Sequence, residues 1–287
     1  MPAFGRTMDG SKFAKIQPTQ SGAGKRRNTM DSPLMKNQTI ADRSFELAGP
    51  IVHVWPVHTV ASKAIASRLE LILAPEERDR ADRFRFDHLR HSFVLAHGAL
   101  RMLLGRYLNV PPADIQFKYG SKGKPTLASL QTVDFNASHS GDLAVFAFTE
   151  CCKVGIDVEQ IRPLPDMQNI AARFFCSEEA VELMSLNANE REHAFFLCWT
   201  RKEAYIKAIG DGLSAPLDNF RVTIRPGAPA RFIHVNHNAN TANDWRLCDL
   251  QLAPNYAAAL AYRDGERPVV VSPVIDLDEL MSIVPEL

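Results

Sequence analysis

Asp157 and Glu159 are the two residues whose types and spacing point most directly to chemistry. They alternate with Val154, Ile156 and Val158, and this period of two predicts a β-strand. Side chains two residues apart on a strand point to the same face, so the two carboxylates lie side by side, about 7 Å apart along the backbone. Neighbouring carboxylates repel each other unless a cation lies between them, and a divalent ion bound through oxygen is the usual solution. The alternative is an ordinary half-buried strand with a solvated acidic face.

A third carboxylate, Glu203, lies in the segment 195–210, with Lys207 four residues after it. On a helix these two side chains are neighbours, and an exposed pair of this kind contributes only about 0.2–0.5 kcal/mol. The segment is rich in aromatic and aliphatic residues such as Trp199, which indicates that the helix is largely buried. A buried carboxylate needs a cation, so we expect Glu203 to meet the two strand carboxylates at one metal ion.

Ser138 and His139 belong to a run of small polar residues that ends at Gly141. We expect a turn over residues 138–142, whose backbone amides and imidazole suit an anion such as phosphate. The alternative is a histidine with a purely structural role.

Two lysines, Lys122 and Lys124, flank Gly123 in a segment that predicts a flexible basic loop, residues 119–125. The glycine lets the backbone approach a phosphate, and the lysines supply positive charge. The alternative is a loop that is simply solvated.

The elements that position these residues follow one order twice along the chain. The first pass predicts a long helix at 87–108, a proline-marked turn at 111–112, a strand at 115–118 and a hairpin of 133–136 with 143–149. The second predicts a helix at 191–209 closed by Asp211 and Gly212, a turn at 213–217, a strand at 220–224 and a hairpin of 245–252 with 256–262. Corresponding features lie roughly 105–115 residues apart, which indicates an internal repeat.

We therefore predict an α+β fold of two similar lobes in a pseudo-twofold arrangement, each a small antiparallel sheet packed against a long helix. Residues 49–152 form the first lobe, and residues 153–287 form the second lobe with a C-terminal tail. A strand at 51–55 opens the first lobe. Shorter helices are expected at 61–73, after Pro75, at 165–174, and at 177–185 behind a cap formed by Ser177.

Composition places the chain among soluble globular proteins, with 46% hydrophobic and 23% charged residues in a length of 287. The formal net charge is zero, so no overall field draws the protein to nucleic acid or to an anionic membrane. No apolar run approaches the ~18–20 residues of a membrane-spanning helix. The five cysteines show no metal spacing and indicate a reducing, cytoplasmic setting. Residues 1–48 are polar and predict a disordered extension.

Five motifs in register resemble the 4'-phosphopantetheinyl transferase superfamily, in its larger, two-lobed, surfactin-synthetase-activating type. They are A-P-E-E-R-D-R-A-D-R-F from Ala74, G-K-P from Gly123, N-A-S-H-S-G from Asn136, G-I-D-V-E from Gly155 and W-T-R-K-E-A-Y-I-K-A-I-G-D-G-L from Trp199. The resemblance covers residues 51–263.

The resemblance implies an enzyme that transfers the 4'-phosphopantetheine arm of coenzyme A to a serine of an acyl or peptidyl carrier protein and releases adenosine 3',5'-bisphosphate. It implies that Mg²⁺ is held by Asp157, Glu159 and Glu203, that Lys207 contacts the pyrophosphate, and that Glu203 is the candidate base. Coenzyme A contacts are implied for Arg80, Lys122, Gly123, Lys124, Ser138, His139 and Lys207. One departure is Glu77, where relatives of this type carry a second lysine.

Two other functions stay open at this point. A Mg²⁺-dependent phosphohydrolase of coenzyme A or nucleotides would place a water where the carrier serine belongs. A non-catalytic coenzyme A-binding or carrier-binding protein would be expected to have lost an acidic ligand, yet all three carboxylates are present. Two lobes fused in one chain favour a monomer.

Overall fold

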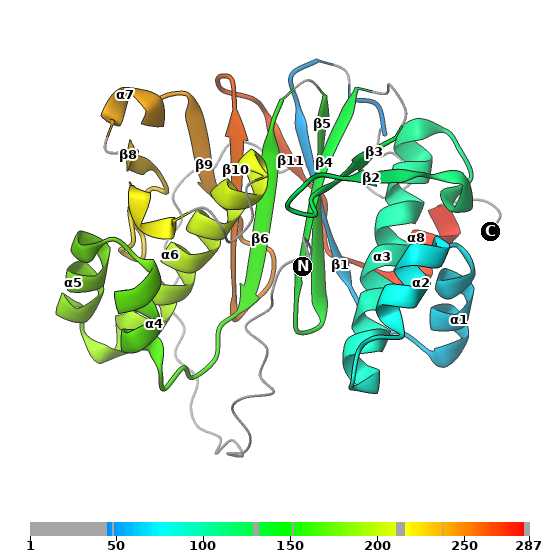
Figure 1. The fold of residues 1–287 in the computed structure, drawn as a ribbon, viewed down its shortest axis with the longest axis horizontal. Helices are drawn as coiled ribbons and strands as arrows, with labels where there is room; N and C mark the ends of the chain where they lie inside the picture. Colours follow the sequence, from blue (N-terminus) through cyan, green and yellow to red (C-terminus); the bar gives the residue numbers. More distant parts are fainter. Residues whose placement is uncertain are drawn as a thin grey trace.

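The computed structural model describes residues 45–47, 49–128, 132–150, 152–210, 216–236 and 238–283. The predicted extension, residues 1–48, lies almost entirely outside these ranges, as do Asp211 and Gly212, where the sequence predicts the end of the second long helix. The described residues form two α+β lobes, each with three antiparallel strands and a 22-residue helix packed against them (Figure 1). In the first lobe, two further strands extend the sheet in parallel. The predicted fold class is confirmed.

The first lobe runs to the end of β5. Its elements are β1 (Val52–His58), α1 (Lys63–Leu71), α2 (Pro75–Ala81), α3 (Asp87–Leu108), the 3-10 helix η3 (Pro112–Asp114), β2 (Phe117–Tyr119), β3 (Pro125–Leu127), β4 (Val133–Ser140) and β5 (Leu143–Glu150). The sheet has the order β1-β5-β4 with antiparallel neighbours, and β2 and β3 form a separate hairpin.

The second lobe repeats this order. Its elements are β6 (Val154–Gln160), α4 (Met167–Phe174), α5 (Ser177–Ser185), α6 (Ala188–Ile209), the 3-10 helix η5 (Leu217–Asn219), β7 (Phe220–Val222), β8 (Phe232–Val235), α7 (Ala239–Ala242), β9 (Trp245–Asp249) and β10 (Tyr256–Arg263). The sheet has the order β6-β10-β9, which matches β1-β5-β4 strand for strand, and β7 and β8 pair as β2 and β3 do.

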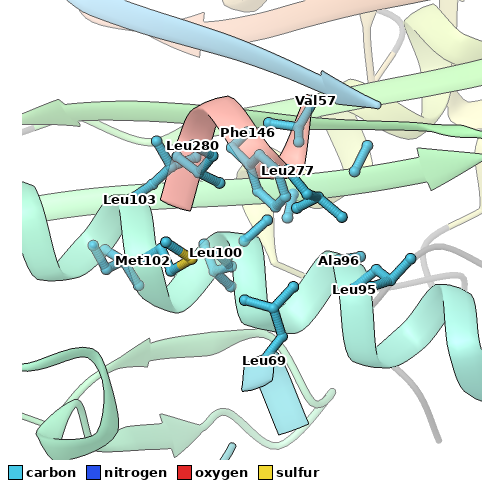
Figure 2. Close-up of a cluster of buried hydrophobic side chains, with 14 of the residues drawn as sticks. Val57, Leu69, Leu95, Ala96, Leu100, Met102, Leu103, Phe146, Leu277 and Leu280 are labelled. Carbon is cyan, nitrogen blue, oxygen red and sulfur yellow. The ribbon is translucent and has the colours of Figure 1, made fainter. Parts of the chain in front are cut away.

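The C-terminal segment returns to the first lobe. β11 (Val269–Val271) and β12 (Ile275–Asp276) pair in parallel with β1, and α8 (Leu277–Ile283) follows them. Leu277 and Leu280 are fully buried in the first lobe's core, beside Leu103 of α3 and Phe146 of β5 (Figure 2). Part of the range 153–287, which the sequence analysis counts with the second lobe, therefore contributes to the first.

Each sheet has one face packed on its own long helix and one face packed on the other lobe. In β1, Trp55 and Val57 belong to the core formed with α3, whereas Val52 and Val54 point the other way. Val52 and Val54 join residues of β6 and β10, such as Ile156, in a third buried cluster shared by the two lobes. The strands are buried on both sides because each serves two cores.

A buried ion pair supports the first lobe at the start of α2. Glu77 Oε2 accepts the Arg101 Nε–H at 2.6 Å and the backbone N–H of Ala74 at 2.9 Å. Glu77 Oε1 lies 2.8 Å from His97 Nδ1. Arg101 also donates to the carbonyls of Pro112, the first residue of η3, and of Ile115, which follows η3. The pair thus ties α2, α3 and the following turn together.

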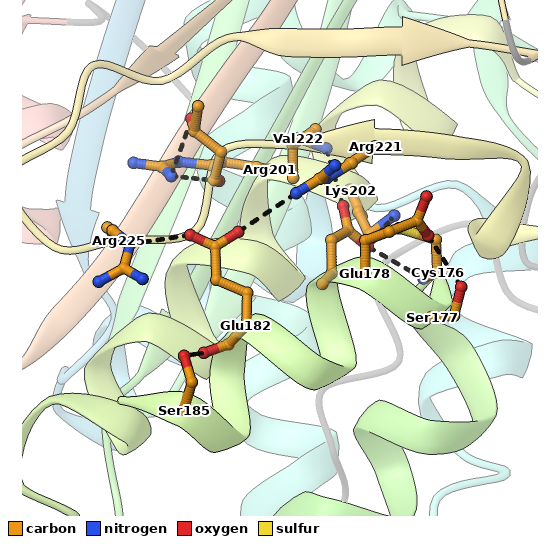
Figure 3. Close-up of polar contacts among 12 residues, drawn as sticks. Cys176, Ser177, Glu178, Glu182, Ser185, Arg201, Lys202, Arg221, Val222 and Arg225 are labelled. Carbon is orange, nitrogen blue, oxygen red and sulfur yellow. Dashed lines mark hydrogen bonds and ion pairs between the residues drawn. The ribbon is translucent and has the colours of Figure 1, made fainter. Parts of the chain in front are cut away.

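The second lobe contains the same device. Glu179 of α5 is fully buried, and its Oε2 lies 2.8 Å from Lys202 Nζ and accepts the backbone N–H of Cys176 at 3.0 Å. Lys202 of α6 also donates to the carbonyls of Leu217 and Phe220, around η5. Figure 3 shows the neighbouring polar contacts of α5, including the ion pairs of Glu182 with Arg221 and Arg225. Since two distant parts of the chain repeat one set of contacts, the internal repeat extends from secondary structure to individual buried charges.

Several local predictions differ from the structure. The helix predicted at 61–73 is shorter, since α1 spans Lys63–Leu71. Strand β3 begins at Pro125, which the sequence analysis assigns to the end of the basic loop 119–125. α5 is capped by Cys176 and Glu179, not by Ser177, whose hydroxyl donates to Glu178. Among the described residues, no helix combines the length and apolar character needed to traverse a bilayer.

We predict that Lys202→Met lowers the free energy of unfolding by about 3–5 kcal/mol, because Glu179 would stay buried without its cation. Urea denaturation of wild type and variant measures the difference. Glu179→Gln in the Lys202→Met background should recover part of the loss, because no buried charge then lacks a partner. Surface substitutions usually change the free energy of unfolding by no more than about ±0.5 kcal/mol. If the single Lys202→Met variant stays within that range of wild type, the buried ion pair does not have this stabilising role.

Candidate active site

The two lobes meet along β4 and β6, which lie next to each other at the centre of the molecule (Figure 1). Their contact is made by side chains of β4 rather than by a backbone ladder. Asn136 Oδ1 accepts the backbone N–H of Ile156 at 2.8 Å. Two residues further along β4, the Ser138 hydroxyl donates to Asp157 Oδ1 at 2.8 Å.

The same pattern continues to the end of β4. The Ser140 hydroxyl donates to Glu159 Oε2 at 2.7 Å and accepts the backbone N–H of Gln160 at 3.1 Å. Asn136, Ser138 and Ser140 alternate along the strand, so all three face β6. We call these contacts the polar seam. It holds both strand carboxylates in place, and each is only 3% exposed.

Helix α6 approaches β6 unusually closely at Gly155. A Cβ atom at this position would lie 2.0 Å from the carbonyl oxygen of Ala204 and 2.3 Å from the amide nitrogen of Ala208. Only glycine fits here, because the obstacle is the backbone of the helix. This contact places Glu203 and Lys207, on the same stretch of α6, over the strand that carries Asp157.

Lys207 connects the helix to the seam. Its Nζ lies 2.6 Å from Asp157 Oδ1, 2.8 Å from the Ser138 hydroxyl and 3.3 Å from the carbonyl of Ile156. Lys207 and Glu203 are each 8% exposed, so the alternative of a surface pair on the helix is excluded. The ion pair of Lys207 is with Asp157 on β6, not with its helical neighbour.

The three carboxyl groups carry more negative charge than this site compensates. Burial raises the pKa of Glu159 to about 8 and that of Glu203 to about 7, and the charge of Asp157 adds to both effects. Burial also raises the pKa of Asp157, against the opposing attraction of Lys207. A single ammonium group is thus shared by a cluster of carboxyls that would all be stabilised by a further cation.

The fit of a metal ion rests on two oxygen atoms. Asp157 Oδ2 and Glu203 Oε1 are buried and accept no hydrogen bond. Within the described ranges, no three histidine, cysteine or acidic side chains already form a metal-ligand cluster. Mg²⁺ usually takes only one or two carboxylates and completes its shell with water and substrate phosphates. The residues present therefore suit a magnesium ion that arrives with a phosphate-bearing substrate.

A group of basic side chains lies near His139. Burial, followed by the positive charges of His97, Lys207 and Arg80, lowers the pKa of His139 to about 4. His139 is therefore a neutral imidazole at neutral pH, and its buried Nδ1 makes no hydrogen bond. Arg80 of α2 is half-buried, with its guanidinium over the Phe93 ring. Together, these basic side chains favour the binding of an anion near His139.

The predicted turn around His139 is wrong in its extent. β4 runs through Ser140, so His139 lies in the strand, and only Gly141 and Asp142 form the turn. The alternation along β4 explains the difference, because Ser138 and Ser140 face the seam while His139 points to the opposite face. Ser138, expected to contact coenzyme A, bonds to Asp157 and Lys207 in this structure.

The basic loop between β2 and β3 is a tight turn with Gly123 at a φ of 84°, a conformation that favours glycine. Lys122 is exposed at its tip. Lys124 extends the other way, and its Nζ donates to backbone carbonyls of the second lobe. Glu77, the departure from the family pattern, is the buried partner of Arg101 and His97.

The sequence analysis does not identify Asn136 and Ser140 as site residues. It also gives no reason why position 155 is occupied by glycine. The alternation of Asn136, Ser138 and Ser140 is visible in the sequence and marks a polar strand face. The partner of that face is visible only in the fold.

We predict that Gly155→Ala destabilises the protein by about 1–3 kcal/mol or more, because the backbone of α6 must move away from β6. Urea denaturation measures this loss. Gly120→Ala is the matched control, since a Cβ there meets no atom nearer than 3.7 Å. Equal stability of Gly155→Ala and wild type would show that the helix is not held in this close contact.

Comparison with known proteins identifies the family. A family model described as "4'-phosphopantetheinyl transferase superfamily" matches residues 153–261, and one described as "4'-phosphopantetheinyl transferase, N-terminal" matches residues 61–151. The two matches adjoin where the first lobe ends and the second begins.

Individual relatives agree with the family models. 4'-phosphopantetheinyl transferase HetI of Nostoc sp. is 37% identical over 213 residues, covering 73% of this chain and 86% of its own length. 4'-phosphopantetheinyl transferase Sfp of Bacillus subtilis is 34% identical over 157 residues, covering 55% and 69%. L-aminoadipate-semialdehyde dehydrogenase-phosphopantetheinyl transferase of Mus musculus is 29% identical over 231 residues, covering 72% and 75%. With its motifs, its two lobes and these relatives in agreement, the chain belongs to the 4'-phosphopantetheinyl transferase superfamily.

Proposed function

We propose that the polar seam is the active site of this transferase, where the 4'-phosphopantetheine arm of coenzyme A passes to a serine hydroxyl of an acyl or peptidyl carrier protein. In this reaction the serine oxygen bonds to the phosphorus that bears the arm. The bridging bond to the nucleotide breaks, and adenosine 3',5'-bisphosphate leaves. The observation that carries this assignment is the pair of buried, unpartnered oxygens, Asp157 Oδ2 and Glu203 Oε1, beside the Lys207 ammonium.

Asp157, Glu159 and Glu203 are the residues proposed to hold Mg²⁺. When bound, the ion neutralises charge on the pyrophosphate and polarises its oxygens. Asp157 and Glu203 each offer an oxygen without a hydrogen bond, and Glu159 contributes a carboxyl whose other oxygen is held by Ser140. The raised pKa values of these groups have the direction expected of ligands that lack their cation.

Lys207 is proposed to stabilise negative charge on the phosphates. Its ammonium is fixed by Asp157 and Ser138, so it needs little reorganisation as charge moves to the leaving group. Ser138 therefore supports the reaction by orienting both partners, in addition to its implied contact with coenzyme A.

Glu203 is the proposed base for the carrier serine. This role rests on the family resemblance and on the position of Glu203, one helical turn before Lys207 on α6. The serine proton would go to a Glu203 oxygen as the new oxygen–phosphorus bond forms. His139 suits this role less, since its pKa of about 4 makes it a weak base.

Arg80, His139 and the loop of Lys122, Gly123 and Lys124 are proposed to lie along the nucleotide end of coenzyme A. Arg80 and His139 are close enough for the charge of Arg80 to lower the pKa of His139, so a 3'-phosphate between them could contact both the guanidinium and the imidazole. His139 would bind this phosphate as a hydrogen-bond donor. Lys122 is exposed at the tip of this loop, where a nucleotide phosphate could approach it.

The other candidate functions gain no support. A phosphohydrolase needs a positioned water as the nucleophile, and no residue assigned above has that role. A non-catalytic binder would not need Glu203 beside the two carboxylates that the seam holds. We expect the protein to act as a monomer, because one chain supplies both sides of the seam. The cysteine composition favours a cytoplasmic setting.

We predict that an apo carrier protein incubated with the enzyme, coenzyme A and Mg²⁺ gains about 340 Da, the mass of the transferred arm, on its serine. Intact-protein mass spectrometry measures this gain. Chelation of Mg²⁺ should abolish it. Consumption of coenzyme A without any carrier mass gain would instead indicate a hydrolase, and binding without either change would indicate a non-catalytic protein.

A further inference from the structure

Lys124 reaches from the first lobe to the end of a helix in the second. Its Nζ donates to the carbonyl of Lys207 at 2.6 Å, to that of Ala208 at 3.3 Å and to that of Val154 at 3.2 Å. Lys207 and Ala208 belong to the last turn of α6, and Val154 opens β6. One ammonium group therefore joins the β2–β3 loop, the end of α6 and the start of β6.

The end of α6 is a favourable place for this cation. The last carbonyls of a helix lack intrahelical partners and carry partial negative charge. Gly210 ends the helix in the left-handed conformation, with φ of 84°, and its N–H bonds to the carbonyl of Ile206. Lys124 accounts for the next two carbonyls. Without it, the turn that carries Lys207 would lose its only side-chain cap among the described contacts.

The three contacts also use all the donors of the ammonium group. A lysine has three N–H bonds, and Lys124 directs them at three carbonyl oxygens. Burial lowers the pKa of Lys124 to about 8, partly offset by the attraction of Asp134. A phosphate could bind this group only by displacing its carbonyl partners.

Lys207 is consequently held at both ends. Its own ammonium bonds to Asp157 and Ser138 in the seam, while its backbone carbonyl accepts from Lys124. We propose that Lys124 is a positioning residue, which fixes the last turn of α6 and thereby the Lys207 ammonium relative to Asp157. This inference rests on the proposed role of Lys207. It differs from the family-derived assignment of Lys124 as a coenzyme A contact.

The two roles of Lys124 predict different kinetics. A positioning residue affects the rate of the bound complex, because misplacing a catalytic group by about 1 Å can cost 10²-fold in rate. A phosphate contact affects binding, so its loss raises KM for coenzyme A. Its loss also reduces the enzyme's preference for coenzyme A over 3'-dephospho-coenzyme A. A purely structural residue would change the stability and neither kinetic constant.

The first experiment compares Lys124→Met with Lys118→Met, which removes an exposed lysine from the adjacent strand β2. For Lys124→Met we expect kcat to fall roughly 10- to 100-fold, with KM for coenzyme A within about twofold of wild type. The preference for coenzyme A over its 3'-dephospho form should not change. Lys118→Met should match wild type. A raised KM with an unchanged kcat would overturn the proposal in favour of phosphate contact.

The second experiment asks whether Lys124 acts through Lys207. In a Lys207→Ala background, Lys124→Met should change kcat less than about twofold, because the group it positions is absent. Independent, multiplicative losses would overturn the proposal. If Lys207→Ala alone retains the wild-type kcat, the role proposed above for Lys207 fails. If Lys207→Ala is impaired but Lys124→Met is not, only the positioning role fails.

A second variant, which keeps a neutral hydrogen-bond donor at position 124, allows the test if the first variant does not fold. Should Lys124→Met not fold, Lys124→Gln retains a polar group that can bond to one of the carbonyls. It should fold, with kcat between those of wild type and Lys207→Ala and with an unchanged KM. A Lys124→Gln variant with wild-type kcat would overturn the proposal.

Discussion

The structure depends on how two edge strands, β4 and β6, are joined without a backbone ladder. Side chains of Asn136, Ser138 and Ser140 replace the ladder and bind to β6 through two backbone amides and two carboxylates. A carboxylate used in this way must be buried, and burial makes its negative charge costly. The seam that joins the lobes therefore also creates an electrostatic deficit, because its carboxyl groups are buried with too little positive charge to balance them. A bound cation would supply that charge.

The duplicated architecture explains why the deficit lies at the centre. Each lobe satisfies its own buried charges, with Glu77 paired to Arg101 and Glu179 paired to Lys202. Between the lobes the only lysine bonded to the strand carboxylates, within the part of the chain that the structure describes, is Lys207. Stability of the individual lobes and chemistry between them thus rely on separate sets of ionisable residues.

Much of this site is legible in the sequence, and the rest depends on contacts between distant segments. Alternation predicts that Asp157 and Glu159 share a face, and the apolar surroundings of Glu203 predict its burial; the structure agrees on both. Periodicity cannot show that Gly155 faces a helix backbone, or that Lys124 bonds to carbonyls 83 and 84 residues away. The return of β11 and β12 to β1 is equally invisible, because parallel pairing across such a separation leaves no local pattern.

The central claim is that the seam carboxylates lack a cation that the substrate complex supplies. Calorimetric titration of Mg²⁺ into the protein with saturating coenzyme A tests it most directly. The account predicts one site per chain in wild type and in Asp79→Asn, which removes an exposed carboxylate, and binding at least about tenfold weaker in Asp157→Asn. Equal Mg²⁺ affinity in Asp157→Asn and wild type would contradict it.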